Sequence, residues 1–173
     1  MTDVLEIVAG YRPGVIGRIT QVHGEYYASR WGVDARFEGE VARELGDFVR
    51  RFDPARSGLW TVWSHDGVVG AIAIDGQSGE PGDARLRWFI LDPDYQGRGI
   101  GRRLMTTAMD FCAQAGHRRV YLWTAADLDA ARALYEAFGF TLVEEYEDGV
   151  WGAPIRHQRY ELALTPGERL RSR

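Results

Sequence analysis

Apolar residues recur along this chain with two periods, one typical of helices and one typical of strands. Four stretches repeat apolar residues every three to four positions and predict amphipathic helices at residues 15–31, 35–52, 100–115 and 127–138. Shorter runs, rich in β-branched and aromatic residues, predict strands at residues 4–8, 59–64, 68–75, 84–91, 119–124, 140–146 and 157–164. Elements in this order indicate an α/β fold.

Capping and turn residues support several of these boundaries. Asp34 is a suitable N-cap for the second helix, and Asp53-Pro54 is expected to end it. Asp66-Gly67 favours a tight hairpin turn between two strands. Gly116 follows the third helix, where a glycine commonly ends a helix. The local signals therefore agree with the periodic pattern.

The stretch from residue 85 to residue 103 predicts a phosphate-binding turn. Asp92-Pro93-Asp94 ends the central strand, and Gly97, Gly99 and Gly101 lead directly into the apolar stripe of the third helix. Glycines permit positive φ and a close approach of the backbone to a ligand, while the free N–H groups and positive dipole end of a helix favour an anion. Arginines add positive charge at the same place: Arg98, Arg102 and Arg103.

Two other phosphate-binding loops do not fit this spacing. A dinucleotide fingerprint requires G-x-G-x-x-G directly after a strand, whereas this chain has G-x-G-x-G after the intervening residues 92–96. A Walker loop requires Gly-Lys-Ser/Thr, which the sequence lacks.

Residues 96–101 read Gln-Gly-Arg-Gly-Ile-Gly, and residues 134–140 read Leu-Tyr-Glu-Ala-Phe-Gly-Phe. These two motifs resemble the Gln/Arg-x-x-Gly-x-Gly/Ala signature and the Leu-Tyr-x-x-x-Gly-Phe ending of the GNAT superfamily of N-acetyltransferases. Leu91-Asp92-Pro93 stands where the family has Val-x-Pro. The resemblance covers nearly the whole chain and implies the α/β GNAT fold, a mixed central β-sheet of about seven strands flanked by about four helices.

A narrower resemblance is to the acetyltransferase domains that follow MarR-type DNA-binding domains in some bacterial proteins. It rests on residues 23–27, 37–38 and 158–162. Because there is no room for such a domain ahead of residue 15, we expect a free-standing relative.

The resemblance implies acetyl-CoA as the acyl-donor cosubstrate. Main-chain amides from Gly97 to Gly101 would hold its pyrophosphate, and the edge of the central strand would pair with its pantetheine arm. The positions expected to bind acetyl-CoA are Phe89, Ile90, Leu91, Gln96, Gly97, Arg98, Gly99, Ile100, Gly101 and Arg102.

Acetyl transfer from a thioester to an amine requires a neutral nucleophile, stabilisation of an oxyanion and a proton for the departing thiolate. Tyr135 lies where the family places the tyrosine that protonates the sulfur, and an ordinary tyrosine is protonated at neutral pH. A backbone N–H near Leu91 is the expected oxyanion donor. Many family members have asparagine seven residues before this tyrosine, in contact with pantetheine, but this chain has Leu128.

The resemblance places the acceptor amine beside the first two helices, and the general base stays open among several residues there. Trp151 is a candidate to cover the acceptor, because it lies in an otherwise polar loop. The candidate acceptor residues are His23, Tyr27, Glu38, Arg87 and Trp151, with Glu25 as a further candidate base. An acceptor that arrives deprotonated needs no side-chain base.

Composition indicates a single domain at residues 1–165 and a disordered tail at 166–173. The net charge of −4, without a basic stripe, argues against nucleic-acid binding. The single cysteine, Cys112, excludes a disulfide framework, and the histidines lack metal-ligand spacing, so no metal is expected. The N-terminus lacks the features of a signal peptide, and no stretch is apolar enough to cross a membrane, so we expect a cytoplasmic protein.

These observations favour an enzyme that transfers an acetyl group from acetyl-CoA to a primary amine of a small molecule, with a tyrosine as general acid. Acetylation of protein lysines or N-termini is the second enzymatic hypothesis. A non-catalytic CoA-binding regulatory module is the third. The acceptor, the use of other acyl groups and a homodimeric state all stay open.

Overall fold

A seven-stranded sheet runs through residues 4–165, the part of the chain that the computed structural model describes. Its strands lie in the order β1-β2-β3-β4-β5-β7-β6, and within this sheet only β4 and β5 pair in parallel. The strands are β1 (Glu6–Ala9), β2 (Gly58–Ser64), β3 (Gly67–Asp75), β4 (Asp83–Leu91), β5 (Arg119–Ala125), β6 (Thr141–Asp148) and β7 (Ile155–Ala163). The helices are α1 (Val15–Trp31), α2 (Ala35–Arg50), α3 (Ile100–Gln114) and α4 (Asp129–Ala137), with a 3₁₀ turn, η1 (Pro93–Tyr95).

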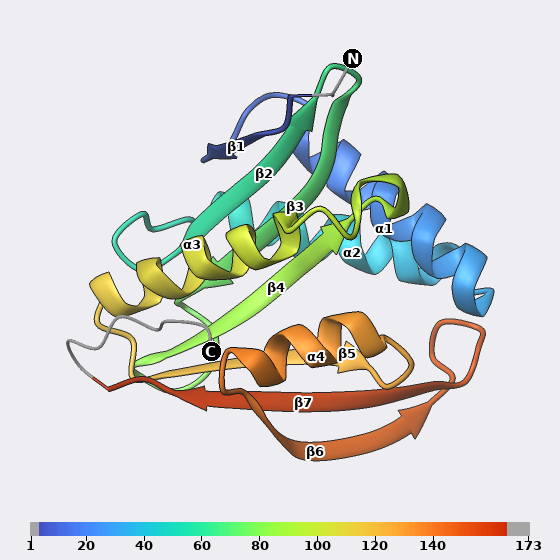
Figure 1. Cartoon of the computed structure of the whole chain (residues 1–173). Helices are drawn as coiled ribbons and strands as arrows, with labels where there is room; N and C mark the ends of the chain where they lie inside the picture. The colour runs from blue at the N-terminus through green and yellow to red at the C-terminus, as the bar shows by residue number, and fades with distance from the viewer. Residues whose placement is uncertain (1–3, 166–173) are drawn as a thin grey trace.

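Helices α1 and α2 cover one face of the sheet, and helices α3 and α4 cover the other (Figure 1). On one face, α1 and α2 bury an apolar cluster that includes Leu45 and Phe48 of α2, both fully buried. On the other face, α3 and α4 bury a second cluster that includes Leu104 and Met105 of α3. Each amphipathic helix therefore covers the sheet with the apolar stripe that its periodicity predicts.

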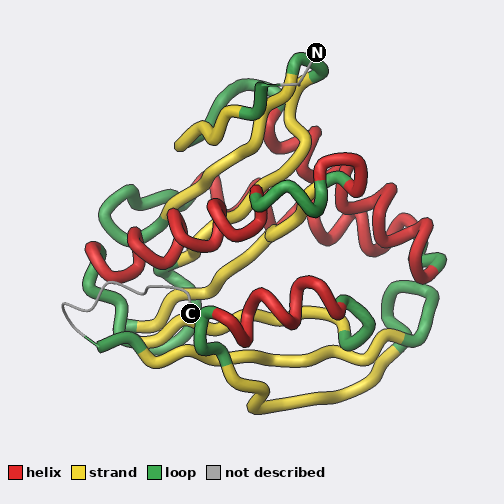
Figure 2. Tube along the Cα trace, viewed as in Figure 1, coloured by secondary structure: helices red, strands yellow, loops and turns green. Residues whose placement is uncertain are grey.

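Strands β4 and β5 are paired at one end only. Residues 83–85 of β4 are in register with residues 119–121 of β5, and beyond them the two strands diverge (Figure 2). Strand β5 pairs along its whole length with β7 on its other edge. Within the described residues, the edge of β4 from Leu86 to Leu91 that faces β5 therefore has no strand partner, and its backbone groups are available to a ligand.

A β-bulge at Trp88 changes which residues of β4 face each helical layer. Ala73 of β3 lies opposite Arg87 and Ala71 lies opposite Ile90, so β4 has one residue more than β3 in this interval. Trp88 has a φ of 46°, and both Arg87 and Trp88 lie on the side of α2. The bulge therefore shifts the alternation of side chains between the two faces of the sheet by one residue.

The predicted fold class is confirmed, and the element ends differ in places. The first strand is 6–9 rather than 4–8, because its pairing with β2 runs from Glu6 to Ala9. Helix α2 ends at Arg50, before the predicted Asp53-Pro54 stop. Strands β6 and β7 extend further than expected and leave only residues 149–154 between them. The tail predicted at residues 166–173 lies outside the described residues.

Candidate active site

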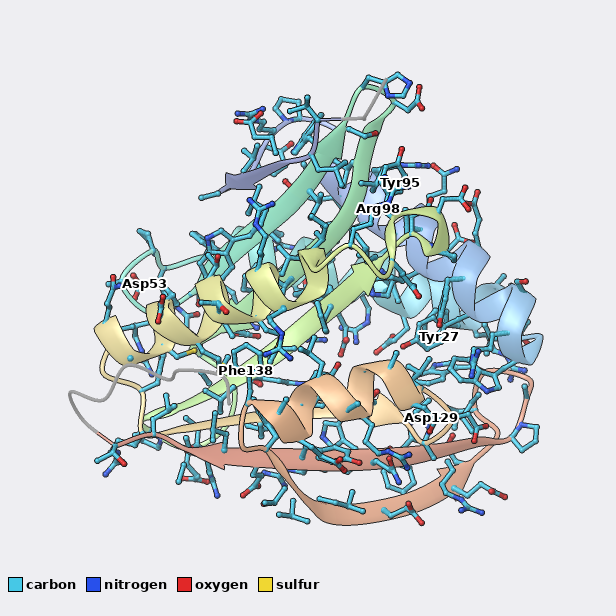
Figure 3. The ribbon with its side chains drawn as sticks, viewed as in Figure 1. Tyr27, Asp53, Tyr95, Arg98, Asp129 and Phe138 are labelled. Atoms are coloured by element: carbon cyan, nitrogen blue, oxygen red, sulfur yellow. The ribbon has the colours of Figure 1, made fainter. Side chains whose placement is uncertain are left out.

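Two clefts lie where β4 and β5 diverge, on opposite faces of the sheet. The α3–α4 cleft, of about 470 Å³, is lined by residues that include Phe89, Leu91, Gly97, Gly99, Leu128 and Leu134. The α2 cleft, of about 410 Å³, is lined by residues that include His23, Glu44, Arg85, Arg87, Trp123 and Trp151. Tyr27 borders both clefts, so they adjoin at this residue. Figure 3 shows Tyr27 between α1 and the end of α4 at which Asp129 lies.

The N-terminus of α3 opens into the α3–α4 cleft. Gly99 is the N-cap, with a φ of 76°, and neither a capping side chain nor an acidic residue occupies the first turn. The first amide groups of the helix therefore lack a side-chain acceptor and keep the positive dipole end exposed. A Cβ at Gly97 or Gly99 would meet no atom within 4 Å, so it is positive φ, rather than crowding, that favours glycine here. Gln96 donates from Nε2 to the carbonyl oxygen of Leu91 at 2.9 Å, which ties this turn to the end of β4.

Most positions predicted to bind acetyl-CoA line the α3–α4 cleft, namely Phe89, Ile90, Leu91, Gln96, Gly97, Gly99, Gly101 and Arg102. Arg98 and Ile100 do not. The Arg98 guanidinium donates to the carbonyl oxygen of Asp94 at 2.9 Å and lies over the Tyr95 ring (Figure 3). Ile100 is buried in the core, because the first residue of α3 points toward the sheet.

Leu128 lines the same cleft at the beginning of α4. The family's asparagine would offer an amide to the pantetheine arm at this position, whereas leucine offers only an apolar surface. Position 128 therefore offers no polar contact to the arm, whereas the free edge of β4 presents backbone donors and acceptors in the same cleft.

Tyr135 lies inside the molecule beside the junction of the two clefts, and it lines neither of them. Burial raises the pKa of its hydroxyl far above the ordinary value, Tyr27 raises it further, and a hydrogen bond with Thr124 acts in the opposite direction. Because Thr124 lines the α2 cleft and Tyr27 borders both clefts, the hydroxyl is directed toward the junction. Three rings pack around Tyr135 with centroids at 6.0–6.1 Å: Phe89, Phe140 and Tyr160.

Most of the predicted acceptor residues line the α2 cleft: His23, Tyr27, Arg87 and Trp151. Glu38 is different, because it lines neither cleft and its carboxylate lies against Gly24 of α1. Glu40 and Glu44 of α2 also line the cleft, although the sequence analysis did not name them as acceptor residues. The helical period places these two one turn apart on the edge of the apolar stripe, and this was the signal in the sequence that could have identified them. Glu25 lines neither cleft and accepts a hydrogen bond from Gln21.

A network of ion pairs connects the α2 cleft to the sheet. Arg87 pairs with Glu44 of α2 and lies 3.7 Å from the fully buried carboxylate of Asp75. Arg51 donates two hydrogen bonds to the same carboxylate. Burial alone would raise the pKa of Asp75, but the hydrogen bonds and charge of Arg51 lower it below the ordinary value. The positive charge of Arg87 is thus balanced by the carboxylates of Glu44 and Asp75, and its side chain links α2 to β4.

His23 and Tyr27 form an uncharged wall of the α2 cleft at neutral pH. The His23 Nδ1–H donates to the carbonyl oxygen of Ile19 at 2.8 Å, which leaves Nε2 without a proton in the neutral ring. Burial lowers the pKa of His23 to about 4, although the bond to Ile19 acts in the opposite direction. Burial likewise raises the pKa of Tyr27 to about 12. The two rings stack with centroids 6.2 Å apart.

The model of the acetyltransferase (GNAT) family matches residues 18–140. The chain belongs to this family. The uncharacterized N-acetyltransferase YjgM of Escherichia coli is 30% identical over 134 residues, which cover 76% of this chain and 77% of YjgM. The N-alpha-acetyltransferase RimI of Mycobacterium tuberculosis is 55% identical over 101 residues, 58% of each chain.

Solved structures share the fold at low sequence identity. The structure of yncA from Salmonella typhimurium with its cofactor acetyl-CoA has a TM-score of 0.69 at 16% identity, covering 98% of this chain and 99% of that one. A likeness at such identity concerns the fold alone. The chain spans about half the length, or less, of several curated relatives that it matches, 53% of one and 30% of two others.

Two features are absent from residues 4–165, a metal-binding group and a membrane-spanning helix. No group of three or more His, Cys, Asp or Glu side chains in this range is arranged to hold a metal ion. No helix in this range combines the length and apolar character needed to cross a membrane. Cys112 is buried, and burial raises the pKa of its thiol, which is typical of an inert core cysteine.

Proposed function

We propose that this protein is an N-acetyltransferase that transfers an acetyl group from acetyl-CoA to a primary amine of a small molecule. The observation that carries the proposal is the uncapped N-terminus of α3, which opens into a cleft that adjoins a second cleft across the sheet. The first cleft suits a phosphorylated donor and the second suits an acceptor. The adjoining clefts provide a place where the two can meet.

The residues present fit acetyl-CoA, which supplies the acetyl thioester. The amides at the start of α3 would bind the pyrophosphate, and Arg102, which lies over the Phe138 ring, would add positive charge. The free edge of β4 would pair with the amide groups of the pantetheine arm. The yncA relative, solved with acetyl-CoA, is consistent with this use of the fold.

Tyr135 is proposed as the general acid. Its raised pKa keeps the hydroxyl protonated throughout the physiological range, as a group that donates a proton to a thiolate must be. Thr124 would orient the hydroxyl, and the surrounding rings exclude water from it.

The α2 cleft is proposed to bind the acceptor. Its size lies within the range of about 300–1,000 Å³ typical of small-molecule sites. Trp151 and Phe37 meet edge to face in its wall, with ring centroids 5.1 Å apart. His23, with a pKa near 4, would be a weak base, so the acceptor is proposed to arrive as the neutral amine.

The experiment is calorimetric titration of acetyl-CoA with the wild type and two glycine variants. Gly99→Val places a β-branched side chain at a positive φ in the cleft, and we expect the Kd to rise at least about tenfold. Gly116→Val is the matched control, because Gly116 also has a positive φ (73°) and open space around it but lies at the other end of α3. Equal affinities of all three proteins would contradict the proposed donor site.

Turnover is measured as release of the free CoA thiol with a panel of amines. Turnover with small amines supports the proposal, whereas binding of acetyl-CoA without any turnover would favour the regulatory module. Acetylation of protein N-termini is the second candidate, favoured by the 55% identity to RimI. Longer peptides with free N-termini belong in the panel for this reason, and a strong preference for them over amino acids, dipeptides and other small amines would favour the second candidate.

A further inference from the structure

Arg85 is a cation of the α2 cleft for which residues 4–165 provide no counterion. It lies on β4 and lines the cleft. Its Nε–H is buried and has no hydrogen-bond acceptor, and within residues 4–165 it forms no ion pair. The terminal nitrogens are not among these buried atoms, so they are the part of the guanidinium that an anion in the cleft can reach.

The other charged groups of the cleft are already paired. Arg87 pairs with Glu44 and lies near Asp75. Glu40 accepts hydrogen bonds from Arg43. His23 is neutral at pH 7. The unbalanced charge in the cleft is therefore the positive charge of Arg85.

Arg159 shows that an orphaned Nε–H alone does not make a binding site. Its Nε–H is also buried without an acceptor, but its terminal nitrogen lies 2.6 Å from the carboxylate of Glu161. Arg159 lines neither cleft, whereas Arg85 combines an unpaired guanidinium with a place in the cleft wall. Only Arg85 therefore offers an incoming ligand an unpaired guanidinium in the wall of a cleft.

We propose that the acceptor carries a carboxylate and that Arg85 binds it, which restricts the substrates to amino acids and short peptides. The inference rests on the proposed function, because it assigns the substrate class of the same site. The planar guanidinium suits a carboxylate, since it can donate two parallel hydrogen bonds to it. The aromatic walls of the cleft would hold the body of the acceptor, and its amine would reach the junction beside Tyr27.

The test compares each acceptor with its own amide. Amino acids and dipeptides are assayed beside their C-terminal carboxamides, which keep the amine and the side chain but lack the anion. For the wild type, we expect kcat/KM to be about 10- to 100-fold higher for the carboxylate member of a pair. In Arg85→Gln, we expect this ratio to fall to near one, through loss of activity on the carboxylate member alone. Arg85→Lys keeps the charge without the planar fork and should restore part of the ratio.

Arg156→Gln is the matched control, because Arg156 is exposed on β7 and lines neither cleft. It should keep the ratio of the wild type. Since no carboxylate depends on Arg85 for its charge, Arg85→Gln leaves no anion unpaired, and a thermal melt should show that the variant folds. Tryptophan fluorescence provides a binding measurement, because Trp88, Trp123 and Trp151 line the cleft.

The outcomes separate this inference from the proposed function. Equal kcat/KM for carboxylates and amides in the wild type, or a preference that survives Arg85→Gln, overturns the inference. Turnover of simple amines without any turnover or fluorescence response from the carboxylates also overturns it and leaves the proposed function standing. If no acceptor in the panel gives either turnover or a fluorescence response, the inference is overturned too. Absence of acetyl-CoA binding instead refutes the proposed function, on which the inference rests.

Discussion

Lowering the pH from 7 to 5 is expected to destabilise this protein through one buried histidine. His23 is 6% exposed, and burial lowers its pKa to about 4, against about 6.5 for an ordinary histidine. Between these two values the unfolded chain binds a proton at this residue and the folded chain does not. Acid therefore favours the unfolded chain, and stability rises with pH through this window.

The size of the effect follows from the two pKa values. At pH 5 the unfolded histidine is almost fully protonated, which favours unfolding by about 2 kcal/mol relative to a group that never titrates. At pH 7 the same contribution is only about 0.2 kcal/mol. His23 should therefore lower the free energy of unfolding by about 2 kcal/mol between pH 7 and pH 5.

The assay is urea unfolding at both pH values, followed by tryptophan fluorescence, for the wild type and His23→Gln. Glutamine is neutral at every pH, so the variant should lose about 2 kcal/mol less than the wild type on acidification. His65→Gln is the control for the loss of a histidine, because this side chain is 73% exposed and lacks the burial that lowers the pKa of His23; it should not reduce the acid destabilisation. Equal pH dependence of the wild type and His23→Gln would refute the reasoning, since His23 would then titrate alike in the folded and unfolded chains.

Three further predictions concern the reaction, the ion-pair network and the acceptor cleft. Tyr135→Phe should lower kcat about 100-fold without changing the Kd of acetyl-CoA, and an unchanged rate from pH 6 to 9 would rule out the acid role. Asp75→Asn should lower the free energy of unfolding in urea by about 2–3 kcal/mol, because it leaves Arg51 with a weaker partner in a buried site. Since the pKa of Asp75 is lowered in the folded protein, this difference should be complete above about pH 4 and shrink below it, where the unfolded chain gains a proton at Asp75 before the folded protein does; a difference that persists at lower pH would contradict this. Trp151→Ala should raise the KM of the acceptor several-fold with little effect on the KM of acetyl-CoA, and equal effects on both would contradict its place in the acceptor cleft.

The sequence by itself determined the elements and the family. Periods of 3.6 and 2 residues, with the caps and turns around them, located the helices and strands to within a few residues, because these signals are local in the chain. The glycines at 97 and 99 predicted an open helix N-terminus, since the need for positive φ follows from the backbone at that position. Tyr135 was singled out by its place in a motif, and its role stays a prediction.

Only the tertiary structure decided how the charges of the site are shared. Arg85 and Arg87 are indistinguishable by strand position, yet one is unpaired and the other is neutralised by residues from α2 and β3. The bulge at Trp88 and the divergence of β4 from β5 depend on pairing between distant segments, so no local pattern could place them. The turn of Glu40 into the α2 cleft has the same cause, because it depends on how elements far apart in the sequence pack together.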